Sequence, residues 1–528
     1  MRGLILAVMA ALALPGQIAF TRMESPHFEL YTDGSKGRAA DILEHFERVR
    51  SFFLQTINPR ETPGKPRVVV LNSAKTFATF VERKSTIAYY LGLPHRDLIV
   101  VGPAGKGADN QTITHEYLHL LVHQAGMRIP LWMNEGIAEV YSTLQPVGQK
   151  MRVGTPIQGH MLRLRYDWLD IRQVLKAESY GSEEHVGPFY SMSWAIAHML
   201  LLEDDLRPKW TRFTAAMERG IPIEQALRQA YGLTPQQLEQ HVQGYIRGKT
   251  VNVVDFNFKW EEWKGAPETR PATALENGLT MVDLFLSGKD VAGAARHAER
   301  LAGEFPREAG PWEALLTARM WERNKEAGAV AAREAFARGT RNADLLALGA
   351  SLGGAEARAM LDRALTVDPE HFEGLMELAA LQLQAGEDGA AFATLQRVRR
   401  LGAADAARYV RLFVYAAQRS GNEAAAEAAV KEFRAYAVSE RDKAEGEKMA
   451  GMMGRSVTGV LVEVGCSASG QVLHVDSGGV RAIPVDAGQT LRVSGVEFDL
   501  HCGVMKRKPR VRVGLSGEGK ARALEILR

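Results

Sequence analysis

The segment His115-Glu116-Tyr117-Leu118-His119 constrains the fold of this chain more than any other. It lies within Thr112 to Gln124, which has no Gly or Pro and is rich in apolar residues, so we predict a buried helix there. Histidines four residues apart share one helical face, where two imidazoles can bind one metal ion. The carboxylate of Glu116 would then be placed to act as a general base. A fold built on this motif must bring a further ligand to the same helix face.

A second predicted helix, Trp132 to Val140 after Pro130, offers that ligand in Glu135. Two histidines and one glutamate leave a fourth position open for water, as hydrolytic zinc sites require. Glu139 lies one turn after Glu135 and can accept a hydrogen bond from the distal ring nitrogen of His115. These residues predict one Zn²⁺ per chain.

The sequence HExxH followed by W-x-N-E-G-x-A-E resembles the gluzincin clan of metallopeptidases, and most closely the bacterial peptidase MA-like proteins. The resemblance covers roughly residues 25–250. It implies a zincin-like α+β domain in which His115, His119 and Glu135 bind zinc and Glu116 is the catalytic base. It also implies that the carboxylate of Glu139 supports a ligating histidine, and we expect Asn134, from the same motif, beside the ligands.

One departure from the clan concerns the substrate. The Gly-Ala-Met-Glu-Asn segment by which its aminopeptidases hold a substrate amino terminus is absent, and Ile99 to Pro103 stands in its place. We therefore predict an endopeptidase, with the strand at Ile99 offering an open edge to an extended peptide.

A fourth group should stabilise the oxyanion, and Tyr190 lies at a distance from Glu135 similar to that of a tyrosine in several clan members. We place it ahead of an apolar helix, Trp194 to Leu202. The alternative for Tyr190 is a core or helix-start aromatic residue. His185 and His198 are interpreted as surface or packing histidines.

A chain of 528 residues exceeds what one hydrophobic core usually organises, so we expect about three domains. The first, residues 23–265, mixes predicted strands and helices and ends in a linker at Pro267 to Pro271. Its predicted elements are strands at His27–Thr32, Arg67–Leu71 and Leu98–Val101, and helices at Arg38–Gln55 and Ala74–Arg83.

Residues 272–450 are rich in Ala, Leu, Glu and Arg at helical spacing, with regular breaks at Gly or Pro from Gly288 to Gly421. This pattern resembles a degenerate tetratricopeptide array that binds a protein partner or substrate. An irregular helical bundle is the alternative.

Residues 456–528 read as short strands of a small β sandwich or barrel without a catalytic constellation. It holds both cysteines of the chain, Cys466 and Cys502, as a disulfide or as two buried thiols.

Residues 1–22 have the pattern of a signal peptide, with an apolar run from Leu4 to Leu14 and small residues at Ala13 and Ala19. We expect cleavage, a periplasmic or secreted protein, and no stable membrane span afterwards. The formal charge of +3 indicates no nucleic-acid partner, and the basic run Lys506 to Arg512 is interpreted as a solvated strand end.

The sequence therefore predicts an exported zinc metallopeptidase that acts on a peptide or protein. Two alternatives remain open. One is an envelope scaffold or interaction protein whose zinc domain is catalytically idle. The other is a zinc hydrolase of a non-peptide amide.

Overall fold

The computed structural model describes two compact units, each considered by itself below. The described residues are 18–56, 64–81, 86–103, 109–127, 129–248, 251–259, 263, 265–437, 440–452, 456–467, 470–485, 491–495, 500–515 and 520–527. The first unit combines the chain up to Thr214 with Leu227–Gly374, and the second combines Ala215–Ala226 with the chain from Leu375 onward. These units divide the chain at points other than the predicted domain boundaries.

A six-stranded mixed sheet organises the first unit, in the order β4-β5-β3-β2-β1-β9. Strands β2, β3 and β5 are parallel, and the remaining neighbours pair antiparallel. The strands are β1 (Thr21–Glu24), β2 (Glu29–Thr32), β3 (Arg67–Val70), β4 (Ala88–Leu93), β5 (Arg96–Val101) and β9 (Glu268–Pro271). Residues in register on the three parallel strands, Leu30, Val68 and Ile99, are all fully buried. Helices α1 (Lys36–Thr56) and α3 (Asp109–Gln124) pack on this sheet.

Phe20 is buried and Thr21 and Arg22 pair in β1, so the sheet begins before the predicted boundary at residue 22, and that boundary stays a prediction. Residues 1–17 lie outside the described part. Two predictions about this sheet need correction. The predicted linker Pro267 to Pro271 contains β9, which covers the edge of β1. The strand at Ile99 has no open edge, because β5 lies between β3 and β4; in the described part of the sheet the two edge strands are β4 and β9.

The predicted helices around the metal motif are present and longer than expected. Helix α4 (Leu131–Ser142) follows Pro130, and α7 (Glu183–Leu202) contains Tyr190. Tyr190 therefore lies inside a helix and not ahead of one, since α7 continues through Pro188. The other described elements before β9 are α2 (Ala74–Ala78), α5 (Gln158–Arg163), α6 (Ile171–Lys176), η1 (Arg207–Lys209), α8 (Trp210–Glu218), α9 (Ile223–Tyr231), α10 (Pro235–Arg247), and a small sheet of β6 (Gln145–Val147), β7 (Lys150–Val153) and β8 (Val254–Asn257).

Eleven described helices follow β9: α11 (Ala274–Ser287), α12 (Val291–Glu304), α13 (Ala309–Trp321), α14 (Lys325–Ala337), α15 (Ala343–Ser351), α16 (Ala357–Val367), α17 (Phe372–Gln384), α18 (Asp388–Leu395), α19 (Ala403–Arg419), α20 (Glu423–Tyr436) and α21 (Glu440–Met452). From α11 to α16 each helix packs on the next. Helices α11, α13 and α15 also contact one another in turn, as stacked helix pairs do and an irregular bundle need not. The tetratricopeptide-like organisation of this region is thus present, and its turns fall at the predicted breaks Gly288, Gly339, Gly386 and Gly421.

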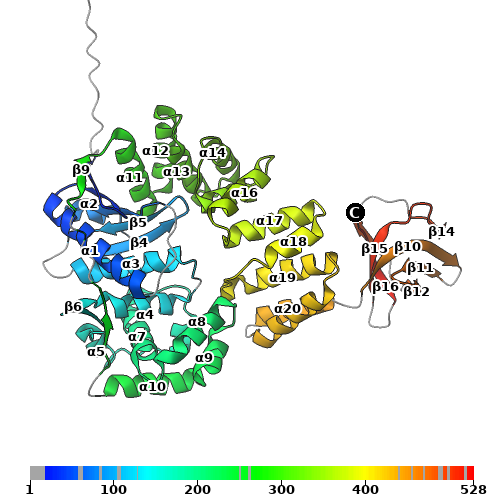
Figure 1. Ribbon diagram of the computed structural model, residues 1–528, viewed down its shortest axis with the longest axis horizontal. Coiled ribbons are helices and arrows are strands. Elements are labelled where there is room, and N and C mark those ends of the chain that lie inside the picture. Colours follow the sequence, from blue (N-terminus) through cyan, green and yellow to red (C-terminus); the bar gives the residue numbers. More distant parts are fainter. Residues whose placement is uncertain are drawn as a thin grey trace, which may run out of the picture. The chain divides into compact units, whose positions relative to one another are not determined.

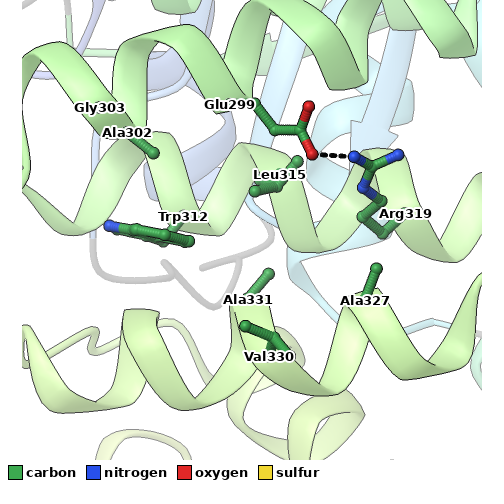
Figure 2. Close-up of a pocket in the computed structure, with 9 residues that line it drawn as sticks. All are labelled: Glu299, Ala302, Gly303, Trp312, Leu315, Arg319, Ala327, Val330 and Ala331. Carbon is green, nitrogen blue, oxygen red and sulfur yellow. Dashed lines mark hydrogen bonds and ion pairs between the residues drawn. The ribbon is translucent and has the colours of Figure 1, made fainter.

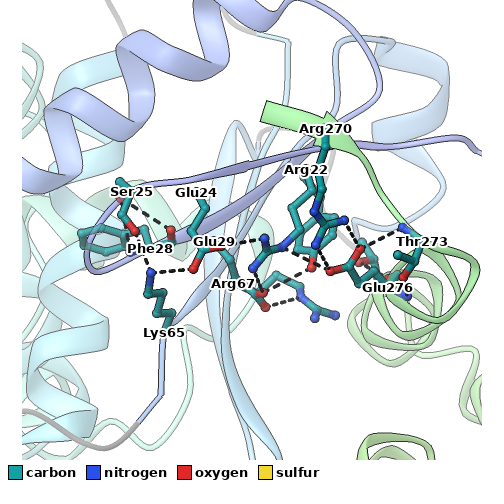
Figure 3. Close-up of polar contacts among 12 residues, drawn as sticks. Arg22, Glu24, Ser25, Phe28, Glu29, Lys65, Arg67, Arg270, Thr273 and Glu276 are labelled. Carbon is teal, nitrogen blue, oxygen red and sulfur yellow. Dashed lines mark hydrogen bonds and ion pairs between the residues drawn. The ribbon is translucent and has the colours of Figure 1, made fainter. Parts of the chain in front are cut away.

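Polar side chains on one face of the sheet bind the first helix of the array, and Figure 1 shows α11 and α3 on opposite sides of β4 and β5. Arg67, only 3% exposed, bonds Glu29 through Nε (3.0 Å) and Asp283 of α11 through Nη1 (2.8 Å). The other oxygen of Asp283 lies 2.7 Å from His95 Nε2. Figure 3 shows the neighbouring part of this network, where Arg22 and Arg270 meet Glu276 of α11. The six-stranded sheet and the helical array therefore share a buried network of charges.

Replacing Asp283 by Ala should destabilise the first unit by about 3 kcal/mol, the lower end for breaking a buried ion pair, because Arg67 and His95 would lose a buried partner while Arg67 keeps Glu29. Urea unfolding of the full chain, followed by tryptophan fluorescence, measures this loss. Asp362→Ala is the matched control, since its partner Arg358 and Asp362 itself are 48% and 59% exposed, and we expect a change within about 0.5 kcal/mol. Equal midpoints for the two variants would contradict a stabilising role for the network.

The same network predicts that the first unit loses stability at low pH. Burial alone would raise the pKa of Asp283, but the charges of Arg96 and Arg67 lower it from 3.8 to about 2. Because the pKa of Asp283 is lowered in the folded protein, its ionised carboxylate stabilises the fold at pH values above about 4. This stabilisation is lost as the pH falls from about 4 toward 2.

The carboxyl-terminal residues form one seven-stranded sheet, and its closure into the predicted sandwich or barrel stays a prediction. Its strands are β10 (Ser456–Ser467), β11 (Gly470–Asp476), β12 (Val480–Pro484), β13 (Arg492–Gly495), β14 (Gly503–Val504), β15 (Arg510–Leu515) and β16 (Ala521–Ile526). Leu461, Leu473, Val511 and Leu524 form the centre of one buried cluster. Cys466 and Cys502 are joined by a disulfide, which answers the alternative left open by the sequence.

Reduction of this disulfide should destabilise the β domain by about 4 kcal/mol in the chain-entropy model, because it closes a loop across 36 residues. Hydrogen exchange of the intact chain, with and without reductant, measures this. We expect faster exchange in β10 and β15 and no change in α13 and α14, which contain no cysteine. Unchanged exchange in β10 after full reduction would contradict the prediction.

Candidate metal centre

Helices α3 and α4 bring His115, His119 and Glu135 together. The two Nε2 atoms lie 3.1 Å apart, and Glu135 Oε2 lies 3.3 Å from the first and 3.4 Å from the second. In a tetrahedral zinc site with ligand bonds of about 2.0–2.2 Å, neighbouring donor atoms are about 3.3–3.5 Å apart. The spacing of these three atoms is close to that value, and they form the one such cluster among the described residues.

The unsatisfied atoms of the cluster also fit a cation. Glu135 is 1% exposed, yet its Oε2 has no hydrogen-bond partner among the described residues. A buried carboxylate oxygen without a partner is costly, and a metal ion supplies the missing interaction. The donor set of two imidazole nitrogens and one carboxylate oxygen is typical of catalytic zinc.

Close packing of two helices holds Glu135 in place. A Cβ atom on Gly136 would lie 2.3 Å from the backbone oxygen of Ser193 in α7. Only glycine allows this approach of α4 and α7, which explains the Glu-Gly pair of the motif.

Carboxylates make the site favourable for positive charge. Burial would lower the pKa of His115, but Glu139, Glu135 and Glu116 raise it to about 10. The pKa of His119 is also raised, against burial, chiefly by Glu135. Burial would raise the pKa of Glu135, but the two histidines lower it. A bound cation would take the place of these protons.

Glu116 is buried beside the ligands and contacts the sheet. Its Oε2 accepts a hydrogen bond of 2.7 Å from the backbone N–H of Tyr90 in β4. Burial raises its pKa, and His115 and His119 oppose that effect. The predicted base therefore lies at the β4 edge of the sheet.

The supporting residues agree with prediction in part. Glu139 Oε1 lies 3.6 Å from His115 Nδ1, which is the expected orientation but longer than a hydrogen bond. Glu139 Oε2 lies 3.2 Å from Nε2 of His160, a residue of α5 that sequence reasoning did not select. Asn134 belongs to the motif on α4 and directly precedes Glu135. Its Oδ1 is buried without a hydrogen-bond partner in the described structure. Its place beside the ligands stays a prediction.

Two tyrosines border the cluster. The ring of Tyr190, the predicted oxyanion donor, lies 6.0 Å from that of His115. Tyr180 was not predicted, although its hydroxyl donates a hydrogen bond of 2.6 Å to Glu135 Oε1. It lies in the segment between α6 and α7, where no periodicity or motif marks it.

The two weaker histidine candidates lie outside the cluster. Nε2 of His198 is 2.8 Å from the carbonyl oxygen of Gly154, and its Nδ1 is 2.7 Å from Tyr245 Oη. His185 is exposed and contacts Ser182 at the start of α7.

A pocket of 410 Å³ lies elsewhere, among α12, α13 and α14 (Figure 2). Its walls include Trp312, Leu315 and Val330, and an ion pair between Arg319 and Glu299 borders it. None of the zinc-motif residues lines it.

No protein-family model and no curated protein matches the chain. Among solved structures it is similar to YrrB, a TPR protein with an unusual peptide-binding site, at 12% identity over 33% of this chain and 91% of that one, with a TM-score of 0.29. A thermophilic TPR protein of Thermus thermophilus, TTC0263, matches at 15% identity over 34% and 99%, with a TM-score of 0.24. The pilus biogenesis factor PilW matches at 18% identity over 34% and 86%, with a TM-score of 0.27. No partner or activity of this chain follows from likenesses at this level.

No helix within the described ranges is long and apolar enough to cross a membrane.

Proposed function

We propose that this protein is a zinc-dependent hydrolase of peptide bonds, with His115, His119 and Glu135 as the metal ligands. The observation that supports this most is the spacing of the three ligand atoms, 3.1–3.4 Å, beside the buried carboxylate of Glu116. A structural zinc site has four protein ligands and no use for a buried base.

Zinc, when bound, supplies Lewis-acid polarisation of the substrate carbonyl and activation of water. Glu116 takes the proton of the attacking water and later donates it to the leaving amine. The hydroxyl of Tyr190 donates to the oxygen on which negative charge develops. The raised pKa of Tyr190, caused first by burial, keeps that hydroxyl protonated.

The unpaired edge of β4 provides a surface for an extended substrate. The N–H of Tyr90 points from this edge toward Glu116, so the edge adjoins the proposed base. A peptide lying along β4 would place its backbone beside Glu116 and the metal ligands. This arrangement favours cleavage within a chain over trimming of its end.

The helical array is proposed to bind a protein partner or the substrate. Its stacked helices and the pocket in Figure 2 favour a second candidate function, an interaction scaffold whose zinc domain is catalytically idle. A zinc hydrolase of a non-peptide amide, such as one in the cell wall, is the remaining alternative.

Export to the periplasm or medium is part of the proposal. The apolar run Leu4 to Leu14 supports it, as does the disulfide, because such bonds persist in oxidising compartments.

Cleavage assays on the purified, zinc-loaded protein discriminate between these functions. We expect casein to be cut at internal bonds, with new amino termini identified by mass spectrometry. Release of sugar-free peptides from the amino sugars of cell-wall fragments, with casein intact, would favour the non-peptide amide. A protein that holds zinc but cleaves neither substrate would favour the scaffold.

A further inference from the structure

The Glu135 carboxylate has two oxygens with different surroundings. Oε1 accepts a hydrogen bond of 2.6 Å from the hydroxyl of Tyr180, whereas Oε2 faces Nε2 of both histidines. Ionised carboxylates are acceptors only, so the tyrosine hydroxyl must be the donor. A hydrogen bond to a charged oxygen at this distance is among the stronger kinds in proteins.

This difference decides how Glu135 can bind a metal. A glutamate can coordinate through one oxygen or through both. The hydrogen bond from Tyr180 takes one acceptor site of Oε1 and fixes the orientation of the carboxylate, whereas Oε2 faces both Nε2 atoms and has no hydrogen-bond partner among the described residues. Binding through Oε2 alone leaves room for a water molecule and a substrate oxygen.

The surroundings of Tyr180 hold its hydroxyl in this position. Its ring stacks on that of Tyr190, with centroids 5.7 Å apart and planes 5° apart, and meets Phe189 edge-on at 5.9 Å. A ring fixed on two sides keeps its hydroxyl aimed at Glu135 with little further loss of entropy.

We infer that Tyr180 is a positioning residue that restricts Glu135 to single-oxygen binding of the metal and so keeps a coordination position open for substrate. The inference deepens the proposed function and rests on its metal site. Tyr180 acts through Glu135 and is not itself assigned a role in bond cleavage.

Metal binding by Tyr180→Phe tests the inference without reference to activity. The change removes the hydroxyl and keeps the stacked ring. We expect the Kd for Zn²⁺, measured by competition with a chelator, to rise about 10-fold, within the range for groups that orient metal ligands. We also expect the visible spectrum of the Co²⁺-loaded variant to change from a four-coordinate to a five-coordinate form, because Oε1 becomes free to bind.

Two tyrosine variants serve as controls. Tyr245→Phe removes a half-buried hydroxyl that contacts His198, away from the cluster, and should keep the wild-type Kd and spectrum. Tyr190→Phe also removes one hydroxyl and keeps the stacked ring, but it leaves the bond from Tyr180 to Glu135, so its Co²⁺ spectrum should stay four-coordinate. A merely structural role for the pair would make Tyr180→Phe and Tyr190→Phe alike.

The outcomes separate this inference from the proposed function. A wild-type protein that binds Zn²⁺, together with an unchanged Kd and Co²⁺ spectrum in Tyr180→Phe, overturns the role of Tyr180 and leaves the zinc site standing. A wild-type protein that binds neither metal overturns both.

Discussion

Replacing Glu116 by Gln should reduce casein cleavage by about 100-fold or more while zinc binding is retained. General acid-base catalysis of this kind contributes about 10²–10⁴-fold, and an amide cannot take a proton from water. The Gln carbonyl can still accept the hydrogen bond from the N–H of Tyr90, so the edge of β4 keeps its position. Initial rates on casein and metal content by mass spectrometry give the two readings.

Glu184→Gln is the matched control for this change, since Glu184 is exposed in the first turn of α7. It should have wild-type rates. If Glu116→Gln cleaved casein as fast as Glu184→Gln does, Glu116 would not be the base.

His119→Ala should lower zinc affinity by more than about 100-fold, because it removes a ligand and not merely a group that supports one. Cleavage should be lost with the metal, and added zinc should not restore it at stoichiometric concentration. Isothermal titration of the metal-free protein with Zn²⁺ measures the effect.

His123→Ala provides a control on the same helix. His123 lies one turn after His119 in α3, but its Nδ1 bonds Asp97 at 2.9 Å and it takes no part in the cluster. We expect near wild-type zinc affinity. Equal weakening by both substitutions would show that damage to α3, and not loss of a ligand, accounts for the result.

Most of what could be predicted about the site came from the spacing of residues close together in the sequence. The separation of His115 and His119 places them on one helical face whatever the rest of the chain does. The second helix of the motif identified Glu135, and the structure brings the three together. In the helical array, glycines at the ends of helices marked the turns in the same way.

Features that depend on distant parts of the chain were not predictable. Strand β9 forms by pairing with β1, about 250 residues earlier, and its own sequence has no strand pattern. The antiparallel pairing of β4 with β5 decides which strand has the open edge, and this corrected the expectation for Ile99. Tyr180 and His160 lie in segments without a motif, so only the folded chain shows that they meet Glu135 and Glu139.

The proposed zinc site is tested by measuring zinc content and casein cleavage of the purified protein. Both are measured before chelation, after chelation, and after zinc is restored. We predict one zinc ion per chain, cleavage that disappears with the metal, and recovery when one equivalent of zinc is returned. Absence of zinc binding, or cleavage that persists in the metal-free protein, would contradict the account.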